Sequence, residues 1–322
     1  MFSKGISMSS KVKVGFFKAV QGAFSAEKVA QIKQRLTDNY NIELIEADFR
    51  EGVLINGKVY VGDICLNDCD VYFWHDTLRP SQSGADNYYV HLLRALEKDV
   101  TVINTADSTE ITNDKLRAHE ALEAAGLPVS RYALVRSEDR AGIEKAFQEL
   151  GSQVLVKPRF GGWGSGIVRC RTIEDLQSAI ELAVALSGRH LHVLLEQFYE
   201  NDPSQWVSVS MVAGRPVIGY RKPLSLSGSD WKVYDPQKKD GRGQSSVYVE
   251  PSSELVDLAK RAQQAIGKDI IGFDFIATPG GFVIVDENGR PGLYQHCLEA
   301  VNIDIVDVIV DLIVSKISID KN

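Results

Sequence analysis

The chain has 322 residues, 44% of them hydrophobic and 25% charged, which is enough to bury a core and excludes disordered and collagen-like proteins. Its 43 acidic and 36 basic side chains give a formal net charge of -7, which argues against binding nucleic acid over the whole surface. No run approaches about 18 apolar residues, so we expect no membrane span. Residues 1–11 lack the apolar segment of a signal peptide, so we expect a disordered leader. The four cysteines form no CxxC pair, which is typical of reduced thiols in a cytoplasmic protein.

The first part of the chain alternates between predicted strands and helices. Ser25 can cap a helix whose apolar residues Val29, Ile32 and Leu36 fall on one face. A strand, a helix and a second strand in this order are typical of an α/β sheet, so residues 12–105 are predicted to form a small doubly wound domain. The expected strands are 12–17, 42–47, 69–75 and 100–104, and the expected helices are 25–39 and 86–98.

The rest of the chain mixes both kinds of element. A helix over 113–125 is expected to end at Gly126, which can adopt a left-handed cap. Residues 224–246 are polar and too long for an ordinary connector, so we expect a functional loop there. The other expected helices are 138–150, 173–187, 252–267 and 303–317. The expected strands are 131–135, 153–158, one starting at 167, 193–198, 206–212, 216–221, 271–277 and 281–286.

The strongest chemical signal is the hairpin GFDFIATPGGFVIVDENGRPGLY. Positions two apart in a strand share a face, so Asp286 and Asn288 are expected to point the same way and Glu287 the opposite way. Asp274, on the other strand, can meet them across the hairpin. Two carboxylates and one amide oxygen form the hard-oxygen site that Mg²⁺ prefers when it also binds nucleotide phosphates.

A second signal is VLVKPRFGGWGSG, in which Lys157 ends an apolar strand before a glycine-rich turn. Glycines let backbone N–H groups approach phosphate oxygens, and a lysine adds a point charge. The turn residues concerned are Gly161, Gly162, Gly164, Ser165 and Gly166. A further lysine, Lys115, follows Asp114 at a helix start and can reach phosphates in combination with the others.

These motifs, in this order and with the NGRPG segment after the hairpin, resemble the ATP-grasp superfamily. More narrowly, residues from about 100 to 318 resemble its carboxylate–amine ligases, which include glutathione synthetase, D-alanine–D-alanine ligase and the enzymes that add glutamate to ribosomal protein tails. The resemblance implies an ATP-grasp fold that follows the N-terminal α/β domain in the chain. Residues 106–192 would form the small subdomain with the glycine-rich flap, and residues 193–322 would form the C-terminal subdomain with the metal site.

The resemblance also implies roles for individual residues. Lys115 and Lys157 would contact the α- and β-phosphates of ATP, and residues 161–166 would cover the β- and γ-phosphates. The segment Glu196, Gln197, Phe198 and Tyr199 would be the hinge whose backbone binds adenine. Either Glu200 or Asp202 would bind the ribose.

The metal residues implied by the resemblance are Asp274, Asp286 and Asn288, which would hold one or two Mg²⁺, or Mn²⁺ in its place. The usual hairpin ligand is Glu, so Glu287 is an alternative to Asp286 if the register is shifted. Arg221 and Arg290 would neutralise the developing acyl phosphate.

The implied function is an ATP-dependent ligase that joins a carboxylate to an amine through an acyl phosphate and releases ADP and phosphate. The substrates would be small, such as amino acids or short peptides, and family members are often dimers. One alternative is ligation on a peptide or protein, by tail addition or macrocyclisation. Another is a nucleotide-binding regulatory module without turnover.

The first domain adds candidate substrate contacts. They lie at the end of a predicted strand, where an α/β sheet binds ligands, and they are His75, Asp76 and Arg79.

Overall fold

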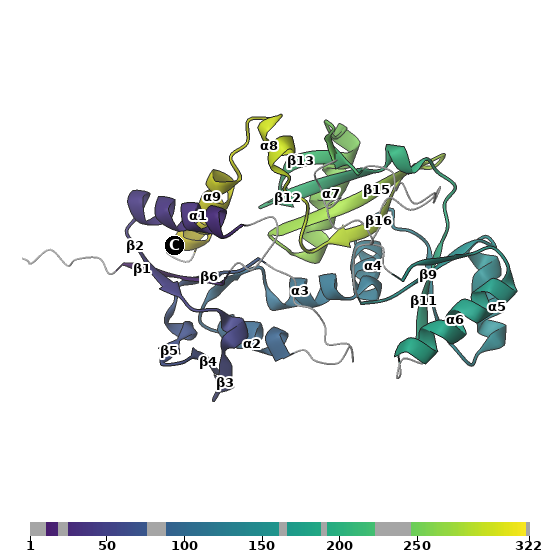
Figure 1. Cartoon of the computed structure of the whole chain (residues 1–322), viewed down its shortest axis with the longest axis horizontal. Helices are drawn as coiled ribbons and strands as arrows, with labels where there is room; N and C mark the ends of the chain where they lie inside the picture. Colours follow the sequence, from purple (N-terminus) through teal and green to yellow (C-terminus); the bar gives the residue numbers. More distant parts are fainter. Residues whose placement is uncertain are drawn as a thin grey trace, which may run out of the picture. The chain divides into compact units, whose positions relative to one another are not determined.

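The computed structural model describes residues 11–18, 25–75, 88–160, 166–187, 192–222 and 246–319. It contains two compact units, which Figure 1 draws in the colours of the sequence. Unit 1 comprises Met1–Asp76, Tyr89–Ala106 and Asp304–Asn322, and unit 2 comprises Thr77–Tyr88 and Asp107–Ile303. The last helix therefore belongs to unit 1. The sequence analysis instead predicts that it is part of a C-terminal subdomain over residues 193–322.

Unit 1 is built on a parallel sheet with the strand order β2-β1-β6-β7. The chain goes from the central strand β1 outward to β2, returns to β6 on the other side of β1, and continues outward to β7. This path is expected for a doubly wound fold. This confirms the predicted N-terminal α/β architecture. The strands are β1 (Val12–Phe16), β2 (Ile42–Glu46), β6 (Val71–Phe73) and β7 (Thr101–Ile103).

Helices lie on both faces of this sheet. Figure 1 shows α1 (Ala26–Asn39) beside α9 (Ile305–Ile319) on one face and α2 (Tyr88–Leu96) on the other. Ser25 caps α1 as predicted, because its side chain accepts a hydrogen bond from the Lys28 N–H. The Arg35 side chain pairs with Asp304 at 2.8 Å and also with Asp307, which joins α1 to the segment of α9.

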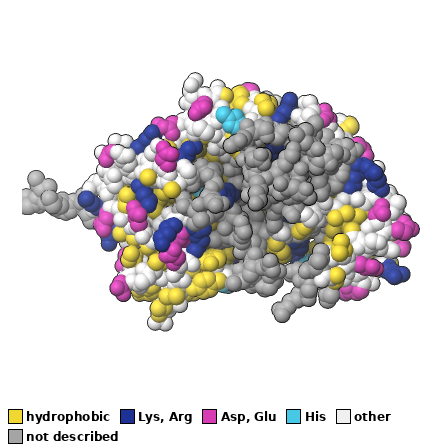
Figure 2. Space-filling view, in the orientation of Figure 1, with side chains coloured by type: hydrophobic (Ala, Val, Ile, Leu, Met, Phe, Trp, Pro, Cys, Tyr) yellow, Lys and Arg dark blue, Asp and Glu magenta, His cyan; other side chains and the backbone are white. Residues whose placement is uncertain are grey.

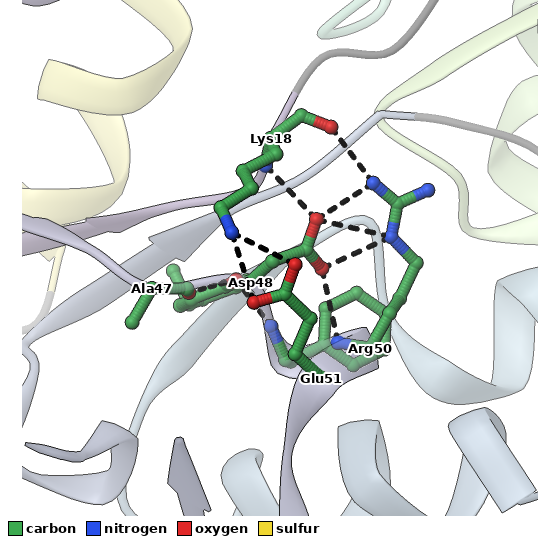
Figure 3. Close-up of polar contacts among 7 residues, drawn as sticks. Lys18, Ala47, Asp48, Arg50 and Glu51 are labelled. Atoms are coloured by element: carbon green, nitrogen blue, oxygen red, sulfur yellow. Dashed lines mark hydrogen bonds and ion pairs between the residues drawn. The ribbon is translucent and has the colours of Figure 1, made fainter. Parts of the chain in front are cut away.

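A polar cluster occupies the carboxyl edge of the parallel sheet, where β1 and β2 end (Figure 3). The Asp48 side chain, in a residue only 2% exposed, accepts hydrogen bonds from the backbone N–H of Lys18 at 2.9 Å and of Arg50 at 2.9 Å. The Arg50 guanidinium also donates to Asp48, and it donates to the Lys18 carbonyl at 2.8 Å. These bonds hold together the two loops that leave the sheet edge.

Unit 1 also contains a small antiparallel sheet that the sequence analysis does not predict. It has the order β3-β4-β5 and contains β3 (Val53–Ile55), β4 (Lys58–Val61) and β5 (Ile64–Cys65). Asn56 and Gly57 both have positive φ angles, of 50° and 83°, so they form the tight turn that an Asn-Gly pair favours between two strands. Such short strands have too few alternating residues to show a periodic pattern.

The first sheet of unit 2 is antiparallel, with the order β10-β9-β11-β8. Its apolar face packs on two helices, α5 (Arg140–Glu149) and α6 (Ile173–Ser187). The strands are β8 (Tyr132–Arg136), β9 (Val154–Lys157), β10 (Val168–Cys170) and β11 (His192–Gln197). Because β11 pairs with β8 and β9, the boundary between the two sheets falls after this strand rather than at residue 193.

The second sheet of unit 2 has the order β14-β13-β12-β15-β16. Helix α7 (Ser253–Ile266) covers one face of it, and its apolar residues join Phe273 and Phe275 of β15 in a buried cluster. The strands are β12 (Val207–Val212), β13 (Arg215–Arg221), β14 (Val247–Tyr248), β15 (Ile270–Thr278) and β16 (Gly281–Asn288). The last two form the predicted hairpin.

The predicted helix over 113–125 is α4 (Lys115–Ala124), which begins with Asp114 as its cap; the Asp114 side chain accepts from the Leu116 N–H. A helix that the sequence analysis does not predict, α3 (Ala106–Asn113), ends just before this cap. Helix α8 (Gln295–Glu299) is an addition to the predicted elements. The cap at Asp114 matters for function because it makes Lys115 the first residue of a helix.

In the described part of the chain, the helices are too short or too polar to cross a membrane. On the face drawn in Figure 2, basic and acidic side chains are interspersed over the described residues. This mixture over the described residues agrees with a formal net charge of -7.

Candidate active site

A β-bulge in the hairpin of unit 2 builds the candidate metal site. Asp274 lies opposite Asp286, but the next pair is Phe275 with Ile284, so Val285 is an extra residue in β16. Without this bulge Asp274 would face Val285. Bulges often re-aim side chains next to functional sites, and this one brings two carboxylates face to face.

Three of the predicted site residues share one face of the sheet. Directly paired residues lie on the same face, which places Asp274 with Asp286, and Asn288 follows two positions later. Glu287 instead lies opposite Phe273, whose side chain is in the core cluster under α7. In this register Asp286, and not Glu287, accompanies Asp274.

Both carboxylates of this face are held by lysines. Asp274 accepts from the Ser208 hydroxyl at 2.6 Å and from the Lys222 ammonium group, and Asp286 accepts from Lys115. Burial alone would lower the pKa of Lys115, but the nearby carboxylates, Asp286 first among them, together raise it by a larger amount. The net pKa therefore lies well above the ordinary value. The pKa of Lys222 is raised in the same way by Asp274. These pairs keep both lysines and the Asp286 carboxylate charged.

The donor set of this face fits a divalent cation of the Mg²⁺ type. Among the described residues, no group of three or more His, Cys, Asp or Glu side chains could hold a metal ion. The face supplies two carboxylates and one amide instead, which are oxygen ligands, and such sites usually keep water and substrate phosphates as the remaining ligands of Mg²⁺. Asp274, Asp286 and Asn288 are therefore the residues that would hold the ion.

Lys157 approaches the same hairpin from the first sheet. It is the last residue of β9 and only 6% exposed, and its ammonium group donates to the Glu196 carboxylate at 2.6 Å and to the Val285 carbonyl at 3.1 Å. The second acceptor is the bulged residue itself. Lys115 and Lys157, the two lysines predicted to bind phosphates, thus both contact β16, one at Asp286 and the other at Val285.

Glu196 is the most deeply buried acid of the site, at 1% exposure. Burial alone would raise its pKa, but the ammonium of Lys157 and the ring of His119 hold the pKa down at about 2. Its carboxylate also accepts from the Ser130 hydroxyl at 2.8 Å. The Glu196 side chain therefore serves as the counter-ion of Lys157.

The predicted adenine hinge follows Glu196. The Gln197 N–H donates to the Arg131 carbonyl at 2.8 Å and the Phe198 N–H donates to the Gln153 carbonyl at 3.0 Å. The Tyr199 hydroxyl accepts from the Arg131 N–H at 3.2 Å. Two of the expected hinge N–H groups are thus used by the fold, because they fasten the end of β11 to its neighbours.

The two candidate ribose ligands have different surroundings. Asp202 accepts from the Ser204 N–H at 2.9 Å. The Ser204 side chain and then this backbone bond lower the pKa of Asp202. Glu200 is 73% exposed in its side chain and pairs with Arg169 at 2.7 Å. Both lie in the segment after the hinge, so the geometry leaves both as candidates.

The remaining predicted residues are placed less completely. Arg221 ends β13, beside Lys222, and Arg290 follows Asn288 by two positions. Gly166 has a φ of 75°, a conformation that glycine adopts readily. Asp76, Arg79 and most of loop 224–246 lie outside the described residues, as do the flap residues Gly161, Gly162, Gly164 and Ser165.

Sequence reasoning overlooked several residues that build this site. Ser208 holds Asp274 from the neighbouring strand, and Ser130 and His119 contact Glu196. The signal for Ser208 is a serine that alternates with valine in a fully buried strand, where its hydroxyl needs a partner. His119 stands four residues after Lys115, on the same side of a helix.

Comparison with known proteins identifies the family. Residues 112–313, more than half of the chain, match the family model described as the RimK-like ATP-grasp domain. The chain belongs to this family. Its match includes both predicted phosphate lysines and the whole hairpin, so the ATP-grasp fold inferred from these motifs is confirmed.

The RimK-like ATP-grasp chain has relatives among carboxylate–amine ligases. It is 23% identical over 286 residues to a probable alpha-L-glutamate ligase of Rhodopirellula baltica, which covers 85% of this chain and 67% of the relative. The matched region spans 53% of a second glutamate ligase and 59% of a D-alanine–D-alanine ligase. Several of these curated relatives are thus considerably longer than the part that this chain matches.

Solved structures show the same fold. A RimK domain ATP-grasp protein from Sphaerobacter thermophilus superposes with a TM-score of 0.67 at 16% identity and covers 94% of this chain and 99% of its own. The ATP-grasp ligase PsnB, in a complex with a minimal precursor, Mg and ADP, gives a TM-score of 0.62 at 16% identity, with 95% and 98% coverage. The named curated relatives are ligases, and the solved structures show that the chain shares their fold; PsnB was also solved with a precursor peptide.

Proposed function

We propose that this protein uses ATP to join a carboxylate to an amine, and that its substrates are amino acids or short peptides. One observation carries the proposal. The bulge at Val285 brings Asp274, Asp286 and Asn288 onto one face and places Lys115 and Lys157 against the same strand. Oxygen ligands for a divalent ion beside paired ammonium groups form an arrangement that binds a triphosphate.

In the proposed reaction the chain supplies position and charge. Lys115 and Lys157 would exchange part of their carboxylate contacts for phosphate oxygens of ATP. When bound, Mg²⁺ would supply charge neutralisation on the transferred phosphoryl group. Arg221 and Arg290, with Lys222, would bind the developing acyl phosphate.

Two steps complete the proposed reaction. An oxygen of the substrate carboxylate attacks the γ-phosphorus and ADP leaves, which gives an acyl phosphate. The amine nitrogen then attacks the acyl carbon, loses a proton and expels phosphate. Little covalent chemistry falls to the protein, so orientation and electrostatics would provide the acceleration.

The type of substrate is also a proposal. The family relatives named as glutamate and D-alanine ligases support amino acids as substrates, and the structural likeness to PsnB keeps a peptide or protein acceptor in consideration. A regulatory module without turnover is less well supported, because both phosphate lysines and all three metal residues are present together.

The test is a ligation screen. The purified chain is incubated with ATP, Mg²⁺ and either pooled amino acids or short peptides, and phosphate release is followed while products are identified by mass spectrometry. Phosphate release that depends on an acid and an amine, with a product of the matching amide mass, supports the proposal. ADP formation without any amide would contradict ligation and indicate a kinase, and no ATP use in either arm would support a regulatory module.

A further inference from the structure

His119 is a buried side chain that contacts Glu196, the counter-ion of Lys157. It lies in α4, one turn after Lys115, and is 3% exposed. Its ring packs edge-on against Tyr132, with 5.2 Å between ring centroids. Buried histidines are often satisfied by one polar contact, whereas this ring meets polar partners at both nitrogens. These contacts indicate a role for His119 beyond hydrophobic packing.

The two ring nitrogens face different elements of unit 2. Nδ1 lies 2.7 Å from the Lys115 carbonyl oxygen in its own helix. Nε2 lies 3.0 Å from the Ser130 hydroxyl oxygen and 3.4 Å from Glu196 Oε1. The ring thus spans the distance between the first turn of α4 and the counter-ion of Lys157.

Counting hydrogens shows which protonation state satisfies this arrangement. A carbonyl oxygen only accepts, so Nδ1 carries a hydrogen. The single hydroxyl hydrogen of Ser130 goes to Glu196 Oε2 at 2.8 Å, so the Ser130 oxygen accepts from Nε2. Both nitrogens of His119 then carry hydrogens, and the ring is an imidazolium, a state assigned here from its partners. Burial lowers the pKa of His119, but the Glu196 carboxylate outweighs this effect and raises it.

The charge of the ring changes the charge of the site. Lys157 and the imidazolium share one carboxylate, that of Glu196, so the three side chains together carry one positive charge. With a neutral residue at position 119 the same group would carry none, because Glu196 would fully neutralise Lys157. In a buried setting that difference acts strongly on a nearby anion. A further charged group that faces the ring is Glu287 of β16.

We propose that His119 is a positioning residue for the nucleotide. Its Nε2 side keeps Glu196 from fully neutralising Lys157, and its Nδ1 side fixes the backbone turn from which Lys115 extends. One residue thereby sets the charge of one phosphate lysine and the placement of the other. This inference rests on the proposed function, in which both lysines bind phosphate oxygens of ATP.

Two substitutions separate the two sides of the ring. The Asn amide in His119→Asn can take the place of Nδ1, so it keeps the bond to the Lys115 carbonyl and loses the contact with Ser130 and Glu196. The longer side chain in His119→Gln can reach Ser130 and Glu196 with a neutral donor. The matched control is Leu122→Ala, a core residue in the same helix, buried at 1% exposure, with no polar contact to the site.

The experiment measures the Kd for ADP with Mg²⁺ by calorimetry, and KM for ATP and kcat by phosphate release, for each folded variant. A hydrogen bond to a charged group is worth about 1.5–3 kcal/mol, so His119→Asn should weaken ADP binding by roughly 10- to 100-fold. KM for ATP should rise with it while kcat changes much less. His119→Gln should recover part of the affinity, and Leu122→Ala should lower the melting temperature with ADP binding within about twofold of wild type.

The outcomes distinguish this inference from the proposed function. Wild-type affinity for ADP in His119→Asn would overturn the positioning role, and so would an equal loss of affinity in Leu122→Ala. If His119→Asn does not fold, His119→Gln decides the question: wild-type affinity together with wild-type KM for ATP would overturn the role, and a raised KM would support it. Failure of the wild-type protein to bind ADP would instead contradict the proposed function.

Discussion

Buried carboxylates serve different purposes in the two units of this protein. In unit 1, Asp48 receives hydrogen bonds from Arg50, next but one in sequence, and from the backbone of Lys18 (Figure 3). The donors to this carboxylate come from the two loops at the sheet edge. The cluster satisfies a buried charge locally, so it stabilises the loops and offers an incoming ligand little to replace.

In unit 2 three acidic residues of the candidate site, Asp274, Asp286 and Glu196, instead each pair with a lysine from another element. Asp286 of β16 binds Lys115 of α4, and Asp274 of β15 binds Lys222 after β13. Such pairs bring together residues that are far apart in sequence and leave several lysines near one strand. A lysine–carboxylate pair can exchange its carboxylate for a phosphate, so this arrangement is suited to binding as well as to stability. The contrast indicates that partner type and origin, more than burial, distinguish the site from the structural cluster.

The largest effect should follow from removing a site carboxylate. Asp286→Ala takes away an oxygen ligand and leaves Lys115 without its counter-ion, so we expect phosphate release to fall by at least roughly 10³-fold. The variant should remain folded, as judged by circular dichroism. Asp257→Ala is the matched control, because this exposed acid of α7 pairs with Arg261 one turn away. Activity within tenfold of wild type in Asp286→Ala would remove the metal role from this residue.

A smaller effect, and the direct test of the comparison, comes from neutralising one buried acid in each unit. Glu196→Gln leaves the charges of Lys157 and His119 without their counter-ion. Breaking a buried pair in this way lowers the unfolding free energy by about 3–5 kcal/mol. Asp48→Asn should cost about 2–3 kcal/mol, since one acceptor oxygen remains for the loop donors. Only the Glu196 variant should also change KM for ATP. Denaturant unfolding and steady-state kinetics measure both quantities, and a KM shift in Asp48→Asn would contradict the distinction.

The pH dependence of stability should reveal Glu196 as well. Its folded pKa of about 2 lies below the ordinary value of 4.5, so its contribution is fully present above pH 4.5 and is lost as the pH falls toward 2. A shift of this size corresponds to about 3 kcal/mol. Unfolding free energies measured between pH 6 and pH 3 should therefore fall less steeply in Glu196→Gln than in the wild type. Identical slopes would indicate that Glu196 titrates normally in the folded protein.

Much of this site follows from the sequence because it depends on alternation along strands. Asp286 and Asn288 share a face as predicted, since their separation of two residues holds in any strand. The partner across the hairpin depends on register, and the bulge at Val285 sets that register. A bulge arises from the packing of the whole sheet, so the sequence could nominate Asp274 with Asp286 and keep Glu287 as the alternative, without fixing the register.

Contacts between distant elements were beyond sequence reasoning for a different reason. His119, Ser130 and Glu196 come from a helix, the segment after it and a strand of the first sheet, and only the folded chain brings them together. The backbone role of Glu196 in the adenine hinge stays a prediction, and the pairing of its buried side chain with Lys157 is a separate contact that the sequence did not indicate. The fold class, in contrast, follows from repeated local patterns, such as the Ser25 cap and the apolar face of α1, that need no tertiary partner.

The smallest effect should come from an ion pair at the surface. Arg35 joins Asp304 and Asp307 in unit 1, but these side chains are between 36% and 65% exposed, so water and salt screen the attraction. Arg35→Ala should therefore lower the unfolding free energy by less than about 1 kcal/mol, and high salt should reduce the difference further. Denaturant titrations at low and high salt measure it. A loss as large as that of Glu196→Gln would show that α9 depends on this contact for docking, and it would weaken the view that only buried pairs carry large energies in this protein.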